Sequence, residues 1–284
     1  MTLTTLNETA AAHASLPSLD AYTALFLDFD GTLVDLASTP ESVVVLPELV
    51  PLLQALNTQL GGALAIVSGR KLVDIDHFLA PLQLTTAAEH GACYRRVNPG
   101  LGDGPPPVEQ LRVLPNFQAL APDVFSLAAQ HPGLQLEVKS SCLALHYRRA
   151  PELEGKARQL MQDAAARAPG MTLLAGKRVF EIKPDHVSKG QAITDLMQHP
   201  PFAGRRSVFV GDDITDEAGF AAVHMLGGDS AKVGPGDTAA RYRFADPTAV
   251  RRWLSLCSLL LTPSATTPLP PAPQLRTPFE RPRP

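Results

Sequence analysis

A stretch of ten residues joins a uniformly apolar run to two aspartates: Ala24-Leu25-Phe26-Leu27-Asp28-Phe29-Asp30-Gly31-Thr32-Leu33. The apolar run at 24–27 predicts a short strand that is buried on both faces. Gly31 lets the chain turn sharply after this strand. Because ligands of open parallel sheets bind just beyond the carboxyl ends of strands, Asp28 and Asp30 stand where a functional site is expected.

Two other apolar runs also end in polar residues. Residues 63–67 precede Ser68 and Arg70, and residues 207–210 precede Asp212. Between the runs, a leucine stripe predicts a helix over about 49–60, and a capping pattern predicts another that begins at 188. Strands that alternate with helices indicate βαβ units, so the fold class is α/β with a parallel sheet.

The middle of the chain breaks this alternation. Helical stretches at about 111–130 and 152–167 are each followed by two strands, at 134–139 and 142–148 and at 171–175 and 178–183. This αββαββ order predicts an α+β module inserted into the α/β fold. The predicted parts are a flexible tail (1–20), a core (21–107 and 184–262), an inserted cap domain (108–183) and a Pro-rich disordered tail (263–284).

Charge and composition exclude several classes of protein. The formal net charge is −3, and residues 1–69 contain no Lys or Arg, so neither a basic targeting peptide nor a nucleic-acid surface is expected. No apolar run is long enough to span a membrane. The three cysteines are widely spaced and fit no disulfide framework, which favours a reducing, cytoplasmic location.

The carboxylates at the strand ends indicate a metal site. Asp28 and Asp30 point the same way from an extended segment, and Asp212 follows a second strand of the same predicted sheet. Like charges this close raise each other's pKa unless a cation lies between them. A hard divalent ion such as Mg²⁺ would supply that cation. The alternative is a polar turn in which both aspartates only cap the following segment.

The motifs, taken in order, resemble those of a known superfamily. Asp28-x-Asp30-Gly31-Thr32-Leu33, Ser68, Lys189 and Gly211-Asp212-Asp213-x-x-Asp216 are similar to the four motifs of haloacid dehalogenase (HAD) phosphohydrolases. Further stretches resemble the trehalose-6-phosphate phosphatase family, over about residues 21–260: Ser68-Gly69-Arg70, Glu89-His90-Gly91-Ala92, Leu136-Glu137-Val138-Lys139, Leu143-Ala144-Leu145-His146-Tyr147-Arg148, Gly176-Lys177, Glu181-Ile182-Lys183-Pro184 and Ser188-Lys189-Gly190.

The resemblance implies a Rossmann-like core with a type C2 cap and a covalent mechanism. Asp28 would attack phosphorus and form an aspartyl-phosphate, and Asp30 would act as general acid and then as general base. Ser68 would donate to a phosphoryl oxygen, and Lys189 would neutralise the phosphorylated aspartate. Arg70 would bind the phosphate or orient the sugar.

The resemblance also implies a metal and a substrate. Asp28, Asp30 and Asp212 would hold Mg²⁺, Asp30 through its backbone carbonyl, and Asp213 or Asp216 would orient it. The polar residues expected to bind disaccharide hydroxyls are Glu137, Lys139, Arg148, Lys177 and Glu181. The alternative for these five is a solvated sheet face with cross-strand ion pairs. His146 is expected to be structural, and the role of His90 stays open.

The implied reaction is hydrolysis of trehalose 6-phosphate to trehalose and phosphate, the last step of trehalose biosynthesis. The alternatives are a phosphatase for another sugar phosphate, such as sucrose phosphate or mannosyl-phosphoglycerate, and a non-catalytic sugar-phosphate sensor. Contact with trehalose-phosphate synthase is a further partner hypothesis. A receiver domain is disfavoured because it needs no cap.

Overall fold

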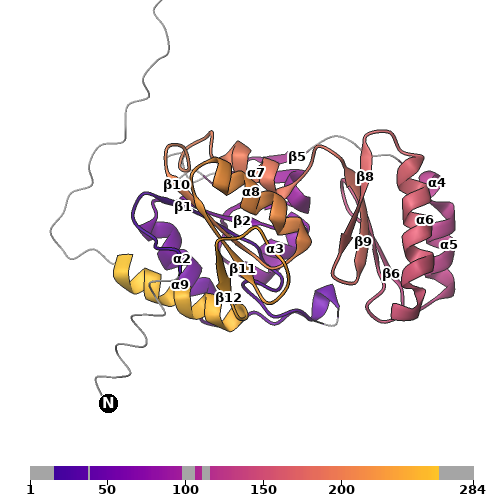
Figure 1. Ribbon diagram of the computed structural model, residues 1–284, viewed down its shortest axis with the longest axis horizontal. Coiled ribbons are helices and arrows are strands. Elements are labelled where there is room, and N and C mark those ends of the chain that lie inside the picture. The colour runs from indigo at the N-terminus through magenta and orange to yellow at the C-terminus, as the bar shows by residue number, and fades with distance from the viewer. Residues whose placement is uncertain (1–15, 38, 98–105, 111–115, 262–284) are drawn as a thin grey trace, which may run out of the picture.

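The computed structural model describes residues 16–37, 39–97, 106–110 and 116–261. These residues form two β-sheets, each with its own helices and its own buried core (Figure 1). The larger sheet has the order β12-β11-β10-β1-β2-β3-β4-β5. Strands β12 to β3 pair in parallel, and β4 and β5 extend the sheet through antiparallel pairs. The strands are β1 (Thr23–Leu27), β2 (Leu64–Val67), β3 (Thr85–Ala88), β4 (Cys93–Arg95), β5 (Val108–Gln110), β10 (Arg206–Gly211), β11 (Asp229–Val233) and β12 (Tyr242–Phe244).

Strand β1 lies at the centre of this sheet. It pairs in parallel with β10 on one side and β2 on the other, and all five of its residues are buried. The chain builds β2 and β3 on one side of β1 and later returns to place β10 on the other, so the strand order reverses here. The carboxyl ends of the three strands therefore bring Asp28, Ser68 and Asp212 to one edge, as the apolar runs predicted.

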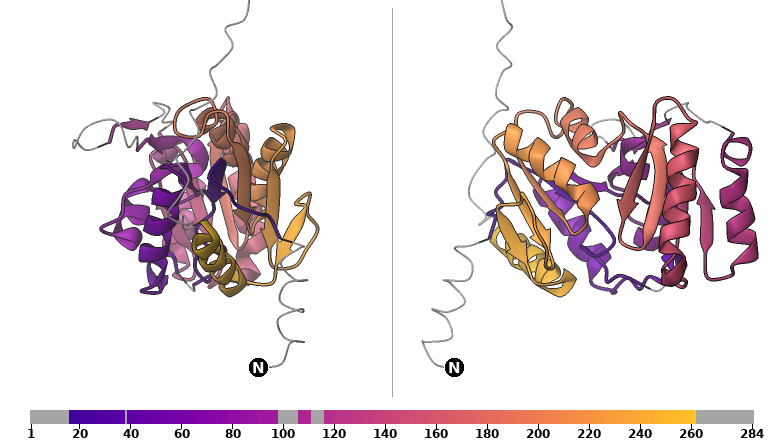
Figure 2. Two further views of the ribbon diagram at one scale, coloured as in Figure 1. Left: turned by 90° about the vertical axis from the view of Figure 1, so that its left-hand side faces the viewer. Right: turned by 45° about the vertical axis from the view of Figure 1, so that its right-hand side comes forward.

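Helices cover both faces of the larger sheet. Figure 2 shows α2 and α3 on one side of the sheet and α8 on the other; α9 packs against α2, and α7 packs against α8. Ser188 accepts a hydrogen bond from the Gln191 N–H at 3.1 Å, which confirms the predicted start of α7. The helices are α2 (Leu49–Gln59), α3 (Leu72–Leu79), α7 (Lys189–Leu196), α8 (Glu217–Met225) and α9 (Pro247–Leu261), with short 3-10 turns η1 (Pro40–Ser42), η2 (Glu89–Gly91) and η4 (Ile214–Asp216).

The smaller sheet and its helices, residues 117–184, are called the cap module below. The sheet is antiparallel with the order β6-β7-β9-β8, and the helices lie on the face that points away from the larger sheet (Figure 1). Its αββαββ order confirms the prediction for the middle of the chain. Its elements are α4 (Phe117–Leu120), α5 (Pro122–Gln130), β6 (Gln135–Val138), β7 (Leu143–His146), η3 (Pro151–Leu153), α6 (Glu154–Ala166), β8 (Met171–Gly176) and β9 (Val179–Pro184).

Two predicted boundaries differ from the structure. Residues 108–110, expected to begin the cap, instead form β5 and pair with β4 in the larger sheet. The expected N-terminal tail is too long, because Leu16 and Leu19 pack against the larger core and Trp253 donates a hydrogen bond to the Pro17 carbonyl. The rest of both predicted tails, and residues 111–115 of the first predicted cap helix, lie outside the described residues.

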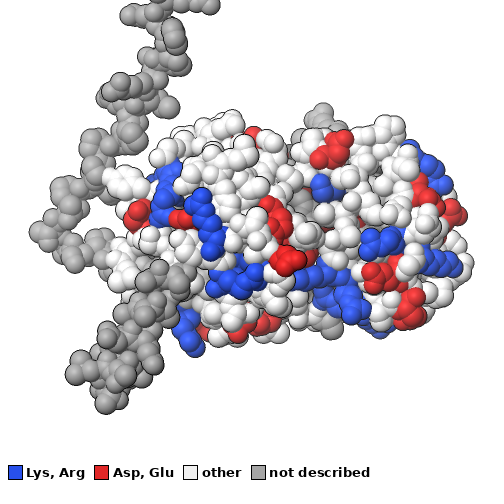
Figure 3. Space-filling model, viewed as in Figure 1, with Lys and Arg blue, Asp and Glu red and all other residues white. Residues whose placement is uncertain are grey.

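Surface charge and hydropathy add two observations. On the face seen in Figure 3, basic and acidic side chains are interspersed over both the larger module and the cap module. No helix in the described ranges combines the length and the apolar character needed to cross a bilayer.

Phe26 tests the importance of the central strand. Its side chain is fully buried in β1 and stacks on Phe202, with ring centroids 5.3 Å apart. Phe26→Ala should lower the free energy of unfolding by about 3–5 kcal/mol, because the cavity cannot fully collapse between two packed layers. Urea unfolding measures this. Val44→Ala, at a side chain that is 73% exposed, is the control; equal effects of the two substitutions would contradict the assigned core.

Candidate functional site

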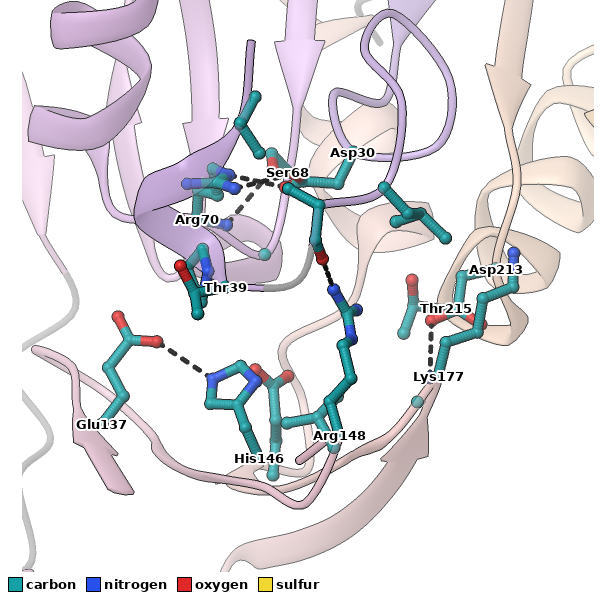
Figure 4. A pocket seen from close by; sticks show the side chains of 18 of the residues that line it. Asp30, Thr39, Ser68, Arg70, Glu137, His146, Arg148, Lys177, Asp213 and Thr215 are labelled. Atoms are coloured by element: carbon teal, nitrogen blue, oxygen red, sulfur yellow. Dashed lines mark hydrogen bonds and ion pairs between the residues drawn. The ribbon is translucent and has the colours of Figure 1, made fainter. Parts of the chain in front are cut away.

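The site lies in a cavity of about 180 Å³ between the carboxyl edge of the larger sheet and the smaller sheet. Figure 4 shows side chains entering it from both sides: Asp30, Ser68 and Arg70 from the larger module, and Glu137, His146 and Arg148 from the cap module. Every predicted site residue except Asp216 lines this cavity. Asp216 is fully buried beside it, in contact with Lys189.

Three buried carboxylates cluster at the base of the cavity, two of them lining it and Asp216 lying behind them. One oxygen each of Asp28, Asp212 and Asp216 lies within 4.8 Å of the others. The Lys189 ammonium donates to Asp28 Oδ1 at 2.7 Å and to Asp216 Oδ1 at 2.6 Å. Lys189 is the first residue of α7. The N-cap hydrogen bond of Ser188, which fixes where this helix begins, therefore also fixes where the ammonium enters the site.

The loop after β10 is held by Asp216. Its Oδ2 accepts hydrogen bonds from the backbone N–H of Asp212 at 2.9 Å and of Asp213 at 2.8 Å. Both oxygens of Asp216 are therefore engaged in fixing the loop and Lys189. Gly31 permits the close approach of the β1 loop: its φ is +75°, and a Cβ added there would lie 2.2 Å from Asp212 Oδ2.

Burial and mutual repulsion perturb the ionisation of this cluster. Desolvation, followed by the negative charges of Asp216 and Asp212, raises the pKa of Asp28 well above its ordinary value. Desolvation also raises the pKa of Asp212. Burial opposes the charge of Lys189, but the attraction of Asp216 and Asp28 outweighs it and raises the pKa of the lysine. Clustered, buried, hard oxygen donors with raised pKa values fit a divalent cation.

Asp30 is separated from this cluster. Arg70 binds both of its oxygens, Nε to Oδ2 at 2.6 Å and Nη2 to Oδ1 at 2.8 Å (Figure 4). The guanidinium lies over the Phe78 ring. The third carboxylate of the close group is that of Asp216, and the contact expected of Asp30 with a metal is through its backbone carbonyl. Ser68 is buried nearby, and its Oγ accepts from the Arg70 N–H at 3.2 Å.

The cap module presents a polar sheet face to the cavity. Lys139 donates to Glu181 Oε1 at 2.8 Å and to the Gly69 carbonyl at 2.8 Å, so it bridges the two modules. Glu137 lies 3.3 Å from His146 Nε2. The alternative for these residues was a solvated sheet face with cross-strand ion pairs. The ion pairs are present, but they face the cavity. The opposite faces of the same strands carry the apolar residues of the second core.

Two further cap residues contact the larger module. Lys177 donates to the Asp212 carbonyl at 2.9 Å and forms an ion pair with the Asp212 carboxylate. Arg148 donates to the Ala37 carbonyl (Figure 4). The cap therefore reaches the carboxylate cluster directly, through a lysine at the β8–β9 turn.

His90 is a cavity residue whose role the sequence alone did not decide. It lines the cavity, and its Nε2 lies 2.7 Å from Glu181 Oε2. It lies just after β3, and a position beyond the carboxyl end of a strand is the sequence signal that could have assigned it to the site. His90 and Glu89 both have positive φ, which the sequence does not show because neither is Gly or Asn.

The comparisons with known proteins agree on one family. A family model described as Trehalose-phosphatase matches residues 26–247. The trehalose-6-phosphate phosphatase of Escherichia coli K12 is 42% identical over 249 residues, 86% of this chain and 90% of that protein. A probable trehalose-phosphate phosphatase of Sinorhizobium fredii is 41% identical over 227 residues, 80% of this chain and 83% of that protein. The crystal structure of a trehalose-6-phosphate phosphatase related protein matches with a TM-score of 0.65 and 28% identity, covering 83% of this chain and 97% of that chain.

The buried ion pairs of Glu181 predict a pH dependence of stability. Burial favours the neutral acid, but Lys139 and His90 hold the pKa of Glu181 well below its ordinary value of 4.5. A carboxylate with a depressed folded-state pKa stabilises the protein above its unfolded pKa, and this contribution is lost as pH falls through the folded pKa. The free energy of unfolding should therefore fall more steeply below about pH 4.5 in the wild type than in Glu181→Gln. Urea unfolding at a series of acidic pH values measures both slopes, with exposed Glu152→Gln as the control; parallel curves for wild type and Glu181→Gln would refute the ion-pair account.

Proposed function

The chain belongs to the trehalose-phosphatase family, and on this premise we propose that it hydrolyses trehalose 6-phosphate to trehalose and phosphate through a covalent aspartyl-phosphate, with Mg²⁺ as cofactor. The α/β core with its inserted α+β module is the HAD fold that the resemblance implied. The observation that carries the proposal is the contact of Asp28, at the end of the central strand, with the buried Lys189 ammonium.

Asp28 has the position of a nucleophile. It is 4% exposed, lines the cavity and is held by Lys189 at one oxygen. A carboxylate whose pKa is raised by burial attacks only when positive charge keeps it ionised. Lys189 supplies part of that charge, and after attack the same ammonium would neutralise the phosphorylated side chain.

The metal would be held by the side chains of Asp28 and Asp212 with the backbone carbonyl of Asp30, and Asp213 or Asp216 would orient it. When bound, Mg²⁺ supplies positive charge that screens the nucleophile from the phosphate and stabilises the transition state. Asp216 would act mainly through its bonds to the Asp212 loop and to Lys189.

Asp30 is proposed as the general acid and base, and Arg70 controls its availability. In the structure Arg70 takes both oxygens of Asp30. A phosphoryl group is an alternative bidentate partner for a guanidinium. Its arrival beside Ser68 would draw Arg70 away and leave Asp30 to protonate the departing sugar oxygen and then to deprotonate the attacking water.

The cap module would select the leaving group. Its sheet face offers carboxylates and ammonium groups side by side, and a sugar hydroxyl both donates and accepts. Glu137, Lys139, Arg148, Lys177 and Glu181 all line the cavity that also contains Asp28. A disaccharide held between the two sheets would also exclude bulk water from the phosphoryl group. All three cysteines are buried and free, which supports the proposed cytoplasmic location.

A panel of sugar phosphates tests the substrate and the metal. Phosphate release should be fastest with trehalose 6-phosphate, and kcat/KM for glucose 6-phosphate should be lower by at least about a hundredfold, because the cap's polar groups would lose their partners. Sucrose phosphate and mannosyl-phosphoglycerate complete the panel. Chelation of divalent ions with EDTA should abolish turnover, and added Mg²⁺ should restore it.

Asp28→Asn is the matched control in this assay, because it keeps the shape of the side chain and removes the nucleophile. It should bind the substrate without releasing phosphate. Preference for glucose 6-phosphate would refute the disaccharide assignment, and sustained turnover by Asp28→Asn would refute covalent catalysis.

A further inference from the structure

Glu89 joins the larger module to the cap through hydrogen bonds that the mechanism does not use. It lies in η2, directly after β3, and is 5% exposed. Its Oε2 accepts from the Ser141 backbone N–H at 3.0 Å and from Ser141 Oγ at 2.9 Å, and its Oε1 accepts from Ser140 Oγ. Among the described residues, all the side-chain hydrogen bonds assigned to this carboxylate come from the β6–β7 turn of the cap.

The backbone at Glu89 is fixed by the loop that carries Ser68 and Arg70. The Glu89 N–H donates to the Arg70 carbonyl and the His90 N–H to the Ser68 carbonyl, both at 2.9 Å. Glu89 and His90 have φ of +50° and +61°, conformations that persist only where the surroundings enforce them. Both side chains are thereby directed at the cap, Glu89 at the β6–β7 turn and His90 at Glu181.

The turn that Glu89 holds directly follows a proposed sugar-binding residue. Lys139 is the residue directly after β6, where the turn begins, and its backbone N–H donates to the Cys142 carbonyl at 2.9 Å. Its side chain extends to Glu181 and to the carbonyl of Gly69. A Cβ added at Gly69 would lie 2.7 Å from the His90 ring, so the Ser68–Arg70 loop and His90 are closely packed together.

We propose that Glu89 is a positioning residue for substrate recognition: its carboxylate anchors the β6–β7 turn of the cap to the Ser68–Arg70 loop, and so places Lys139 and Glu181 over the phosphate site. A buried carboxylate without its donors carries a large desolvation cost, so the docked turn is strongly favoured over a partly withdrawn one. This proposal rests on the proposed function for its choice of substrate, and on the contacts of Glu89 for the rest.

A double-mutant cycle tests the anchor in activity. Glu89→Ala should lower kcat/KM for trehalose 6-phosphate by about 10- to 100-fold, because charge-assisted bonds between the modules are lost. The paired substitution Ser140→Ala with Ser141→Ala should lower it by a smaller factor, because the Ser141 N–H still donates to Glu89, and adding it to Glu89→Ala should lower kcat/KM little further. Glu89→Gln should recover most of the activity, since its amide oxygen accepts from Ser141 and its NH₂ donates to the Ser140 hydroxyl. Hydrolysis of p-nitrophenyl phosphate, which is too small to need the cap, should change little, as should either activity in the exposed-site control Glu152→Ala.

Hydrogen exchange supplies a readout that does not depend on the substrate. The Ser141 amide should exchange at least about tenfold faster in Glu89→Ala than in the wild type, and near the wild-type rate in Glu89→Gln. The proposal would be overturned if the fold losses of kcat/KM from Glu89→Ala and from the paired serine substitutions multiplied in the combined variant. A loss with p-nitrophenyl phosphate as large as that with trehalose 6-phosphate, or unchanged protection of the Ser141 amide in Glu89→Ala, would also overturn it. Failure of the proposed function is distinct, because it would be seen in the wild type alone as poor turnover of trehalose 6-phosphate.

Discussion

The rest of the site depends on one electrostatic constraint, the burial of three clustered carboxylates, two of which contact one buried ammonium. Asp28, Asp212 and Asp216 crowd together at the end of the central strands, and Lys189 bridges two of them. Carboxylates in a poorly solvated site repel one another and take up protons unless cations balance them. Their arrangement is costly for folding alone, which is why it indicates chemistry: a divalent cation would balance the excess negative charge of the cluster.

The cap module extends this electrostatic arrangement across the cavity. Lys177 reaches Asp212 from the cap, and Lys139 reaches the loop that carries Ser68. Glu89 in the opposite module accepts its hydrogen bonds from the cap turn. Contacts across the cavity are thus polar and local, while each module keeps an apolar core of its own. Modules built this way can change their mutual contacts without losing either core.

The sequence predicted what depends on local pattern. Asp28 and Asp212 each follow an apolar strand, and Lys189 follows a helix cap, so their meeting could be inferred from parallel-sheet topology. The pairing of Arg70 with Asp30 was not predicted, because it depends on how two loops forty residues apart pack together. The same holds for Glu89 and His90, whose positive φ is imposed by tertiary contacts, and for β5, a strand of three residues with no distinctive pattern.

Calorimetric titration of Mg²⁺ into the full chain tests the central claim most directly. One ion should bind per chain, with proton release at mildly acidic pH because the pKa values of Asp28 and Asp212 are raised. Asp212→Asn should weaken binding by at least about tenfold, since it removes a charged ligand. Equal Mg²⁺ affinity in the wild type and Asp212→Asn, or no binding to the wild type, would contradict the account.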